Sequence, residues 1–348
     1  MDFREKLKYL VLETIAAVVL LTLLATVLWT TTGPAFDPPN GVLFWLLILF
    51  ICAVIGGKIT ELLRAPPLLG MLFAGFILRN TTSMQIGAEI SAVLRNIALT
   101  VILLRAGFGL DPKALAKLSA VCFRLSFSPC IVETIVAAVT THFIVGLPWQ
   151  WGFLLGFAIS AVSPAVVVPG LISLSERKYG TDKGIPTLVI AAASVDDVLA
   201  ITGFGVLLGV VFSHDTSLVW QILKGPTEAT VGLIIGAFVG LFLWYVPHEN
   251  LKFSSALPLH SNQQRLILSL LFGFAIVFLS LYLEWSGVGP LGALTLSFVA
   301  ALRWRNNGYD VHVEQGLRFI WFFCQPFLFA LIGAEVRLST LDKNIVAS

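Results

Sequence analysis

The chain has 348 residues, of which 57% are hydrophobic and only 12% are charged, and its formal net charge is +2. Soluble domains carry about 25% charged residues, so this chain cannot surround itself with a solvated polar surface. The composition excludes an ordinary soluble domain and predicts an all-α polytopic membrane protein without a nucleic-acid partner. The four cysteines lie in apolar stretches and lack metal-ligand spacing, so we expect neither a disulfide framework nor a zinc site.

Apolar segments recur along the whole chain. Most of them are close to the roughly 20 residues that cross about 30 Å of hydrocarbon as a helix. The first segment is too long and too poor in cleavage signals for a signal peptide, so we expect it to be retained as a helix. The eleven predicted segments are 9–31, 41–62, 67–79, 88–110, 114–144, 149–175, 185–212, 226–247, 265–284, 288–302 and 315–337.

The basic residues support this count and orient the chain. If the N-terminus is cytoplasmic, 15 of the 22 Lys and Arg residues fall in inner loops or ends, and four fall in outer ones. Lys and Arg concentrate on the cytoplasmic side of membrane proteins, so this asymmetry is the expected one. The sequence therefore predicts an integral, multi-pass protein with a cytoplasmic N-terminus, in the plasma membrane or an organellar membrane.

Two of the segments resemble each other. LRNIALTVILLRAGFGL at 94–110 and LRFIWFFCQPFLFALIGAEVRL at 317–338 both open with Leu-Arg-x-Ile and end near an adjacent Ala and Gly. The predicted topology gives them opposite directions across the membrane, which is typical of the inverted repeats of secondary transporters. The alternative is a chance similarity between two apolar helices.

Segment 114–144 contains an acid, Glu133, in the stretch SFSPCIVETIVAAV. Arg124 lies nine residues earlier, which places it on nearly the opposite face of a helix. We therefore expect Glu133 to be a buried acid with another cationic partner. This structural pairing is favoured over a direct role in transport.

The next segment is predicted to be a broken helix. The stretch GFAISAVSPAVVVPGLISL contains Pro164 and Pro169, and Pro164 leaves the carbonyl of Ser160 without its helical partner. Within a membrane, such backbone groups survive only where protein or a wet cavity satisfies them. Unwound helices of this kind form cation sites in several transporters. The alternative is an ordinary proline kink.

Two adjacent acids, Asp196 and Asp197, lie in the otherwise apolar stretch AAASVDDVLAITGFGV. Asp196 follows Ile185 by roughly 16 Å of helix, which is close to the midplane of a core about 30 Å thick. An ionisable residue at that depth is costly and normally faces a water-filled cavity or a partner. A carboxylate in such a place can exchange a proton for a cation. The alternative is an acid that a basic neighbour neutralises permanently.

The stretches PWQWGFLLGFAISAVSPAVVVPG, SVDDVLAITGF, RAGFGLDPKAL and LIGAEV together resemble the NHA-type cation/proton antiporters, the sodium/hydrogen exchanger 9B subfamily of animals. The resemblance covers nearly the whole chain. It implies an inverted-repeat antiporter fold with crossed broken helices, in a homodimer within the lipid bilayer. It also implies secondary active exchange of Na⁺ or Li⁺ for H⁺ by alternating access, without ATP or a cofactor, in a transporter rather than an enzyme.

The resemblance also assigns residues. Asp197 matches the principal cation and proton ligand, which would hold Na⁺ or Li⁺ transiently, and Asp196 matches its paired neighbour. Glu133 matches the core acid that is held in an ion pair, and Pro164 matches the broken helix. No residue is assigned a catalytic role. The supporting core residues are Glu133, Ser163, Pro164 and Ser194.

The predicted domain organisation follows the same resemblance. An extra N-terminal helix precedes a first set of dimerisation or scaffold helices, a core ion-transport domain that forms the first repeat, a second set of scaffold helices, and the start of a second core repeat. The corresponding ranges are 1–31, 41–81, 88–212, 226–302 and 315–348.

The chain departs from the family pattern after LIGAEV. The basic partners of the Asp pair and of the Glu lie beyond this motif in the family, whereas this chain ends at Ser348. We therefore expect an incomplete second repeat without its broken helix. The alternative function is that of a truncated, non-transporting isoform that associates with full-length antiporter subunits. An intramembrane aspartyl protease is disfavoured, because its two aspartates face each other from separate helices.

Overall fold

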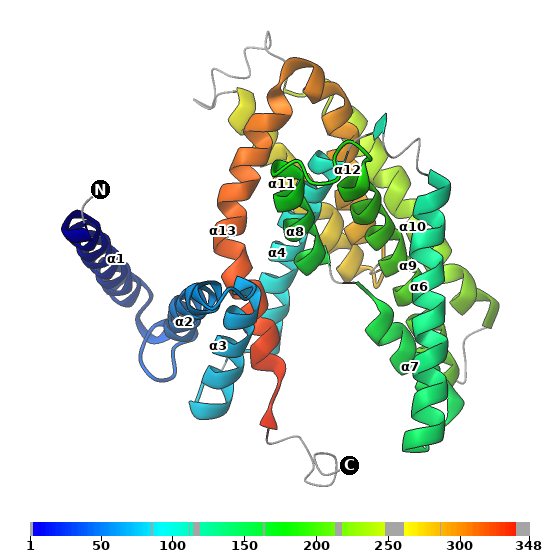
Figure 1. Ribbon diagram of the computed structural model, residues 1–348, viewed down its shortest axis with the longest axis horizontal. Coiled ribbons are helices and arrows are strands. Elements are labelled where there is room, and N and C mark those ends of the chain that lie inside the picture. Colours follow the sequence, from blue (N-terminus) through cyan, green and yellow to red (C-terminus); the bar gives the residue numbers. More distant parts are fainter. Residues whose placement is uncertain are drawn as a thin grey trace. The chain divides into compact units, whose positions relative to one another are not determined.

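Every regular element in the described part of the computed structural model is a helix (Figure 1). The all-α prediction is confirmed, and each predicted apolar segment overlaps at least one helix. The structure describes residues 3–84, 86–110, 112–113, 119–162, 164–212, 218–247, 261–285 and 287–338. The helices are α1 (Phe3–Thr32), α2 (Val42–Leu62), α3 (Pro67–Thr81), α4 (Ala88–Gly109), α6 (Ser119–Thr140), α7 (Trp149–Ser160), α8 (Pro164–Glu176), α9 (Ile185–Phe212), α10 (Leu218–Phe242), α11 (Ser261–Tyr282), α12 (Val288–Trp304) and α13 (Tyr309–Glu335).

Five of the described helical stretches are long and apolar enough to cross a membrane, by length and composition. Large apolar side chains on these helices are exposed, among them Val132 on α6, Leu271 on α11 and Phe319 on α13. Such a surface requires a lipid environment. The protein is therefore an integral membrane protein, while the full number of crossings and the side of the N-terminus stay predictions. The five stretches are Val42–Leu62, Ala88–Gly109, Ala120–Val145, Ser261–Tyr282 and Tyr309–Glu335.

Contacts within the chain divide it into two units, Met1–Arg95 with Phe323–Ser348, and Asn96–Phe322. In the first unit, α2 packs against α3. A Cβ added at Gly75 of α3 would overlap the backbone of Ala330 in α13, so only glycine permits this close approach. Small residues therefore allow these helix backbones to touch.

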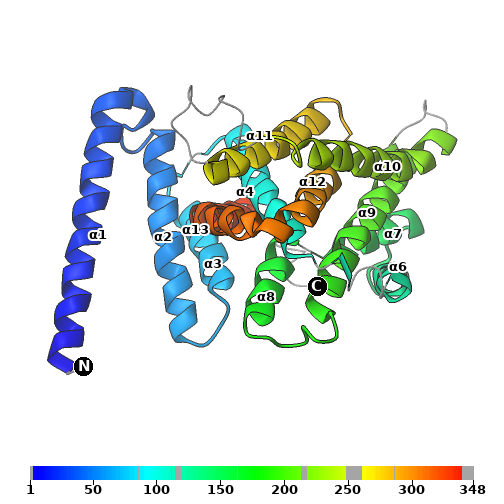
Figure 2. The same ribbon diagram turned by 90° about the horizontal axis from the view of Figure 1, so that it is seen from above.

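The second unit contains the helices that surround α9. Helix α9 packs against α6, α7, α8 and α10, and α6, α7 and α9 lie side by side in both views (Figure 1 and Figure 2). The four consecutive residues from Ile190 to Ala193 are all buried. Because consecutive helical residues point in all directions, neighbouring segments enclose α9 completely at this level. Asp196 follows less than one turn later.

Helix α10 packs closely against α12 in the same unit. Gly232, Gly236 and Gly240 recur every fourth residue and so form one face of α10. A Cβ added at Gly236 would overlap the carbonyl of Gly292 and would lie 2.8 Å from Cβ of Thr295. This small-residue face brings the two backbones together, as is common for membrane helices.

Candidate functional site

The predicted broken helix is confirmed in the backbone. Helix α7 ends at Ser160, and the next residue, Ala161, has the extended values φ −60° and ψ 119°. Helix α8 then begins at Pro164. Proline has no N–H to donate to the preceding turn but suits the first position of a helix, so the sequence both ends one helix and starts the next. Two half-helix ends therefore meet in the interval between residues 160 and 164.

Asp196 lies on α9 beside this interval. Its side chain is only 5% exposed, and its Oδ1 atom has no hydrogen-bond partner among the described residues. The backbone of Val162, in the break, lies close to the carboxylate. The structure thus brings together the buried acid and the broken helix, which the sequence places more than 30 residues apart.

A thiol and a hydroxyl complete the surroundings of Asp196. The Cys130 side chain on α6 lies close to the carboxylate. Its Sγ atom also shares a hydrogen bond with Oγ of Ser160 at 3.4 Å. Cys130 is 1% exposed and Ser160 is 2% exposed. From the sequence, Cys130 was predicted only to be a small residue within an apolar stretch. Its position three residues before Glu133, on the same helix face, was the available signal.

A second serine near the site, Ser126 on α6, joins α6 to α9 by a hydrogen bond. The hydroxyl of Ser126 donates to the carbonyl of Cys122 at 2.8 Å and to that of Ala192 at 3.0 Å, as alternative or shared acceptors. This hydroxyl is fully buried. Because Ala192 precedes Asp196 by about one turn, the bond sets the register of the acid against Cys130.

The expected burial of Glu133 is wrong for this chain. The side chain lies on α6 within electrostatic reach of Asp196, but it is exposed. Its neighbours Val132 and Val136 are exposed as well. No described basic residue forms an ion pair with Glu133, so the predicted pairing stays a prediction. The sequence pattern could not reveal this exposure, because an apolar stretch looks the same whether it faces protein or lipid.

The other predicted site residues are described only in part. Asp197 and Ser194 belong to α9, and Pro164 is the first residue of α8, but their side chains lie outside the described residues. Ser163 lies outside the described residues altogether. Since successive helical residues point about 100° apart, Asp197 faces a different direction from Asp196.

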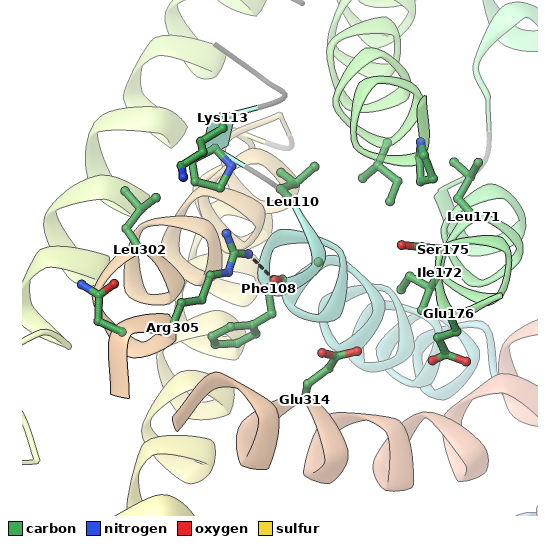
Figure 3. A pocket seen from close by; sticks show the side chains of 15 residues that line it. Phe108, Leu110, Lys113, Leu171, Ile172, Ser175, Glu176, Leu302, Arg305 and Glu314 are labelled. Carbon is green, nitrogen blue, oxygen red and sulfur yellow. Dashed lines mark hydrogen bonds between the residues drawn. The ribbon is translucent and has the colours of Figure 1, made fainter. Parts of the chain in front are cut away.

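A cavity of about 690 Å³ opens at the other end of α8 (Figure 3). Figure 3 shows Glu176, from the end of α8, and Glu314, from α13, along this cavity. Arg305 also lines it and donates a hydrogen bond to the carbonyl of Phe108. Acidic and basic groups thus both line a space large enough for water and hydrated ions.

A charge cluster borders this cavity. Arg318 of α13 forms an ion pair with Glu176, and its Nη2 atom lies 3.8 Å from Oε1 of Glu314. Arg105 of α4 is 7% exposed and lies within electrostatic reach of all three groups. Arg105 was not among the predicted site residues, although an arginine inside an apolar segment is a signal for function.

Comparisons with known proteins agree with the fold and identify the family. Residues 46–347 match the family described as "Sodium/hydrogen exchanger, transmembrane". Sodium/hydrogen exchanger 9B2 of Mus musculus is 46% identical over 342 residues, which are 94% of this chain and 60% of the mouse protein. Sodium/hydrogen exchanger 9B1 of Homo sapiens is 44% identical over 318 residues, which are 88% of this chain and 60% of the human protein.

The structure is also similar to that of the sodium proton antiporter MjNhaP1 from Methanocaldococcus jannaschii at pH 8. The TM-score is 0.65 at 18% identity, and the match covers 87% of this chain and 72% of that one. This similarity shows an antiporter fold. The chain spans about three fifths of the length of the curated relatives it matches. Because the family match extends over most of the chain, this protein belongs to the sodium/hydrogen exchanger family.

Proposed function

We propose that this chain exchanges Na⁺ or Li⁺ for H⁺ across a membrane by alternating access, at a site formed by Asp197 and Asp196. The observation that carries the proposal is the buried Oδ1 atom of Asp196, which has no described hydrogen-bond partner and lies beside the broken helix. Asp197 is the principal ligand in this proposal, with Asp196 as its paired neighbour.

The chemistry follows from the burial of these acids. A charged carboxylate without a counter-ion is strongly disfavoured away from water, so such an acid holds either a proton or a cation. A site of this kind cannot easily move across the membrane empty, and this couples the movement of the two ions. Na⁺ and H⁺, the substrates in the names of the relatives, are then competitors for one site.

The broken helix supports cation binding at the same place. The last carbonyls of α7 have no helical partners beyond the break, and a helix C-terminus carries a partial negative charge. Oxygen atoms from the backbone and from Ser160 can therefore replace part of the water shell of a small cation. Ser163, Ser194 and Pro164 are the supporting residues in this proposal.

The proposal includes an arrangement of domains. The core would comprise 88–212, scaffold helices within 41–81 and 226–302 would form a homodimer in the bilayer, 1–31 would be an extra helix, and 315–348 would begin the second repeat. The ions themselves are the substrates, and no cofactor takes part.

Proton movement driven by sodium, in liposomes that contain only this chain, tests the proposal. We expect Asp197→Asn to abolish the flux and Asp196→Asn to reduce it strongly, because an amide cannot exchange a proton for a cation. Asp182→Asn is the matched control, since Asp182 is an exposed acid in the turn before α9. Full flux in Asp197→Asn would exclude the proposed site.

A second candidate function is association with full-length exchanger subunits without transport by this chain. The exposure of Glu133 among exposed apolar residues of α6 favours it, because a carboxylate facing lipid is costly unless another helix covers it.

Co-purification with a full-length 9B2 relative, combined with no flux of its own, would support this candidate. We expect Glu133→Lys to weaken the co-purification and the exposed control Glu89→Lys to leave it unchanged. Flux by this chain alone would exclude it.

A further inference from the structure

We propose that a membrane phospholipid binds in a groove bounded by α10, α11 and α12, with one acyl chain in the groove and its phosphate group at Lys224. The chemistry that the site recognises is a phosphate ester joined to a hydrocarbon chain. This proposal does not depend on whether the chain transports ions.

The groove is an apolar slot of about 320 Å³. Helix α12 packs against both α10 and α11 (Figure 2). The buried hydroxyl of Ser280 belongs to the wall, but it already donates to the carbonyl of Val277 at 2.7 Å. Such a surface suits a hydrocarbon chain. The lining side chains include Val231 and Ile235 of α10, Ala275 and Leu279 of α11, and Trp285 and Val288 near the start of α12.

Close backbone packing holds the three helices in place. A Cβ added at Gly289 of α12 would lie 2.5 Å from Oγ of Ser280 in α11. A Cβ added at Gly232 of α10 would lie 2.8 Å from the carbonyl oxygen of Val288 in α12. These glycines hold α12 close to both of its neighbours, so the slot between the helices is part of the folded structure.

Lys224 lies at the rim of the groove. It precedes Val231 by seven residues on α10, so the two side chains share one face of the helix. Nζ of Lys224 lies 3.7 Å from Oε1 of Glu228. The amide of Gly287 donates to Oε2 of the same carboxylate at 2.8 Å, which ties the start of α10 to the start of α12. The ammonium group therefore stands where the groove meets these two helix ends.

The rim lies at the depth expected for lipid headgroups. The apolar stretch of α10 begins at Pro226, two residues after Lys224. Trp285 follows the end of α11 by three residues. Tryptophan is enriched at membrane interfaces, and a long lysine side chain extends toward the polar layer. The phosphate of a lipid whose acyl chain fills the groove therefore meets the Lys224 side chain, which is 42% exposed.

The charge of Lys224, and not the apolar wall, selects the ligand. An acyl chain gains little by leaving the bilayer for the groove, because both surroundings are apolar. A lysine near the membrane surface strengthens the binding of an anionic group about fivefold. Glu228 leaves donors of the ammonium group for a phosphate, because 3.7 Å is longer than a hydrogen bond.

The size of the groove favours a lipid chain over a helix of a second copy. One helical turn, about 10 Å wide and about 5.4 Å long, occupies roughly 400 Å³. This exceeds the 320 Å³ of the slot. A flexible chain of methylene groups has no such minimum width.

Native mass spectrometry of the full purified chain tests the proposal. The chain is delipidated in detergent and then incubated with dioleoylphosphatidylcholine or with dioleoylglycerol, which has the same acyl chains but no phosphate. We expect one phospholipid to be retained per chain, and the diacylglycerol to be retained about fivefold less. Equal retention of the two lipids would overturn the recognition of phosphate.

Two variants separate the groove from its rim. Ala275→Phe should abolish retention, because Ala275 is exposed and lines the groove. Leu271→Phe is the matched control, since Leu271 is exposed on the same helix one turn earlier. Lys224→Gln should lower retention about fivefold and Lys224→Arg should restore it. Lys183→Gln is the matched control for charge, because Lys183 is exposed in the turn before α9.

The melting temperature of each variant in detergent shows whether it is folded. Equal phospholipid retention in Ala275→Phe and Leu271→Phe would overturn binding in the groove. Equal retention in Lys224→Gln and Lys183→Gln would overturn the role of Lys224. A loss of dimers in Ala275→Phe with unchanged lipid retention would assign the groove to a second copy of the chain and would also overturn the proposal.

Discussion

Arg318 of α13 forms an ion pair with Glu176, the last residue of α8. The first residue of α8, Pro164, lies at the helix break beside Asp196. Helix α8 therefore links the candidate ion site at one end to the charge cluster and the cavity at the other. These two ends are separated by 13 residues, about 18 Å of helix, with Pro169 inside it.

The ion pair itself should contribute little stability. Both side chains are about half exposed, and exposed pairs contribute about 0.2–1 kcal/mol. We expect a double-mutant cycle of Arg318→Ala and Glu176→Ala, measured by unfolding in detergent, to give a coupling free energy in this range that falls with added salt. A coupling free energy of several kcal/mol would show that the pair is buried in the folded protein.

Asp196→Asn should raise the stability of the chain. The side chain is buried with one oxygen unpartnered, and a neutral amide avoids the cost of charging such a group. We expect a higher melting temperature at pH 8 in the absence of Na⁺, with the gain shrinking as Na⁺ is added or the pH is lowered. Asp182→Asn is the control. A destabilised Asp196→Asn variant would mean that the charged form makes contacts beyond those described.

Gly236→Ala on α10 should destabilise the second unit. The new methyl group would overlap the carbonyl of Gly292 and crowd Thr295, at a cost of about 1–3 kcal/mol in the free energy of unfolding. Gly170→Ala on α8 is the matched comparison, because nothing lies within 4 Å of its added Cβ. We expect that substitution to stabilise the chain by about 0.5–1 kcal/mol. Similar effects of the two changes on thermal unfolding would contradict the close packing of α10 and α12.

Two substitutions of Glu228 should separate the effect of its hydrogen bond from that of its charge at the start of α12. Its Oε2 atom accepts a hydrogen bond from the amide of Gly287 at 2.8 Å, and its Oε1 atom lies 3.7 Å from Nζ of Lys224. We expect Glu228→Ala to lower the free energy of unfolding by about 1–3 kcal/mol, because the buried amide loses its acceptor. Glu228→Gln keeps an acceptor and should cost less. Equal losses in the two variants would assign the stabilisation to the charge instead.

The sequence by itself determined the local features of this protein. Its hydropathy predicted the helices, since a membrane helix needs only a sufficient run of apolar residues. Pro164 predicted the break, because a missing N–H acts within one turn of the chain. Asp196 and Asp197 stood out because charge is costly wherever it occurs in an apolar segment.

Only the tertiary structure decided which helix faces meet. Lipid and protein interior are both apolar, so the sequence of a membrane helix gives little sign of its inward side. The sequence therefore did not predict that Cys130 lies close to Asp196 or that Arg105 lies within electrostatic reach of Glu176. It also did not predict the exposure of Glu133. Each depends on contacts between segments tens of residues apart, where the rotation of one helix about its axis determines whether a side chain points at a neighbour or at lipid.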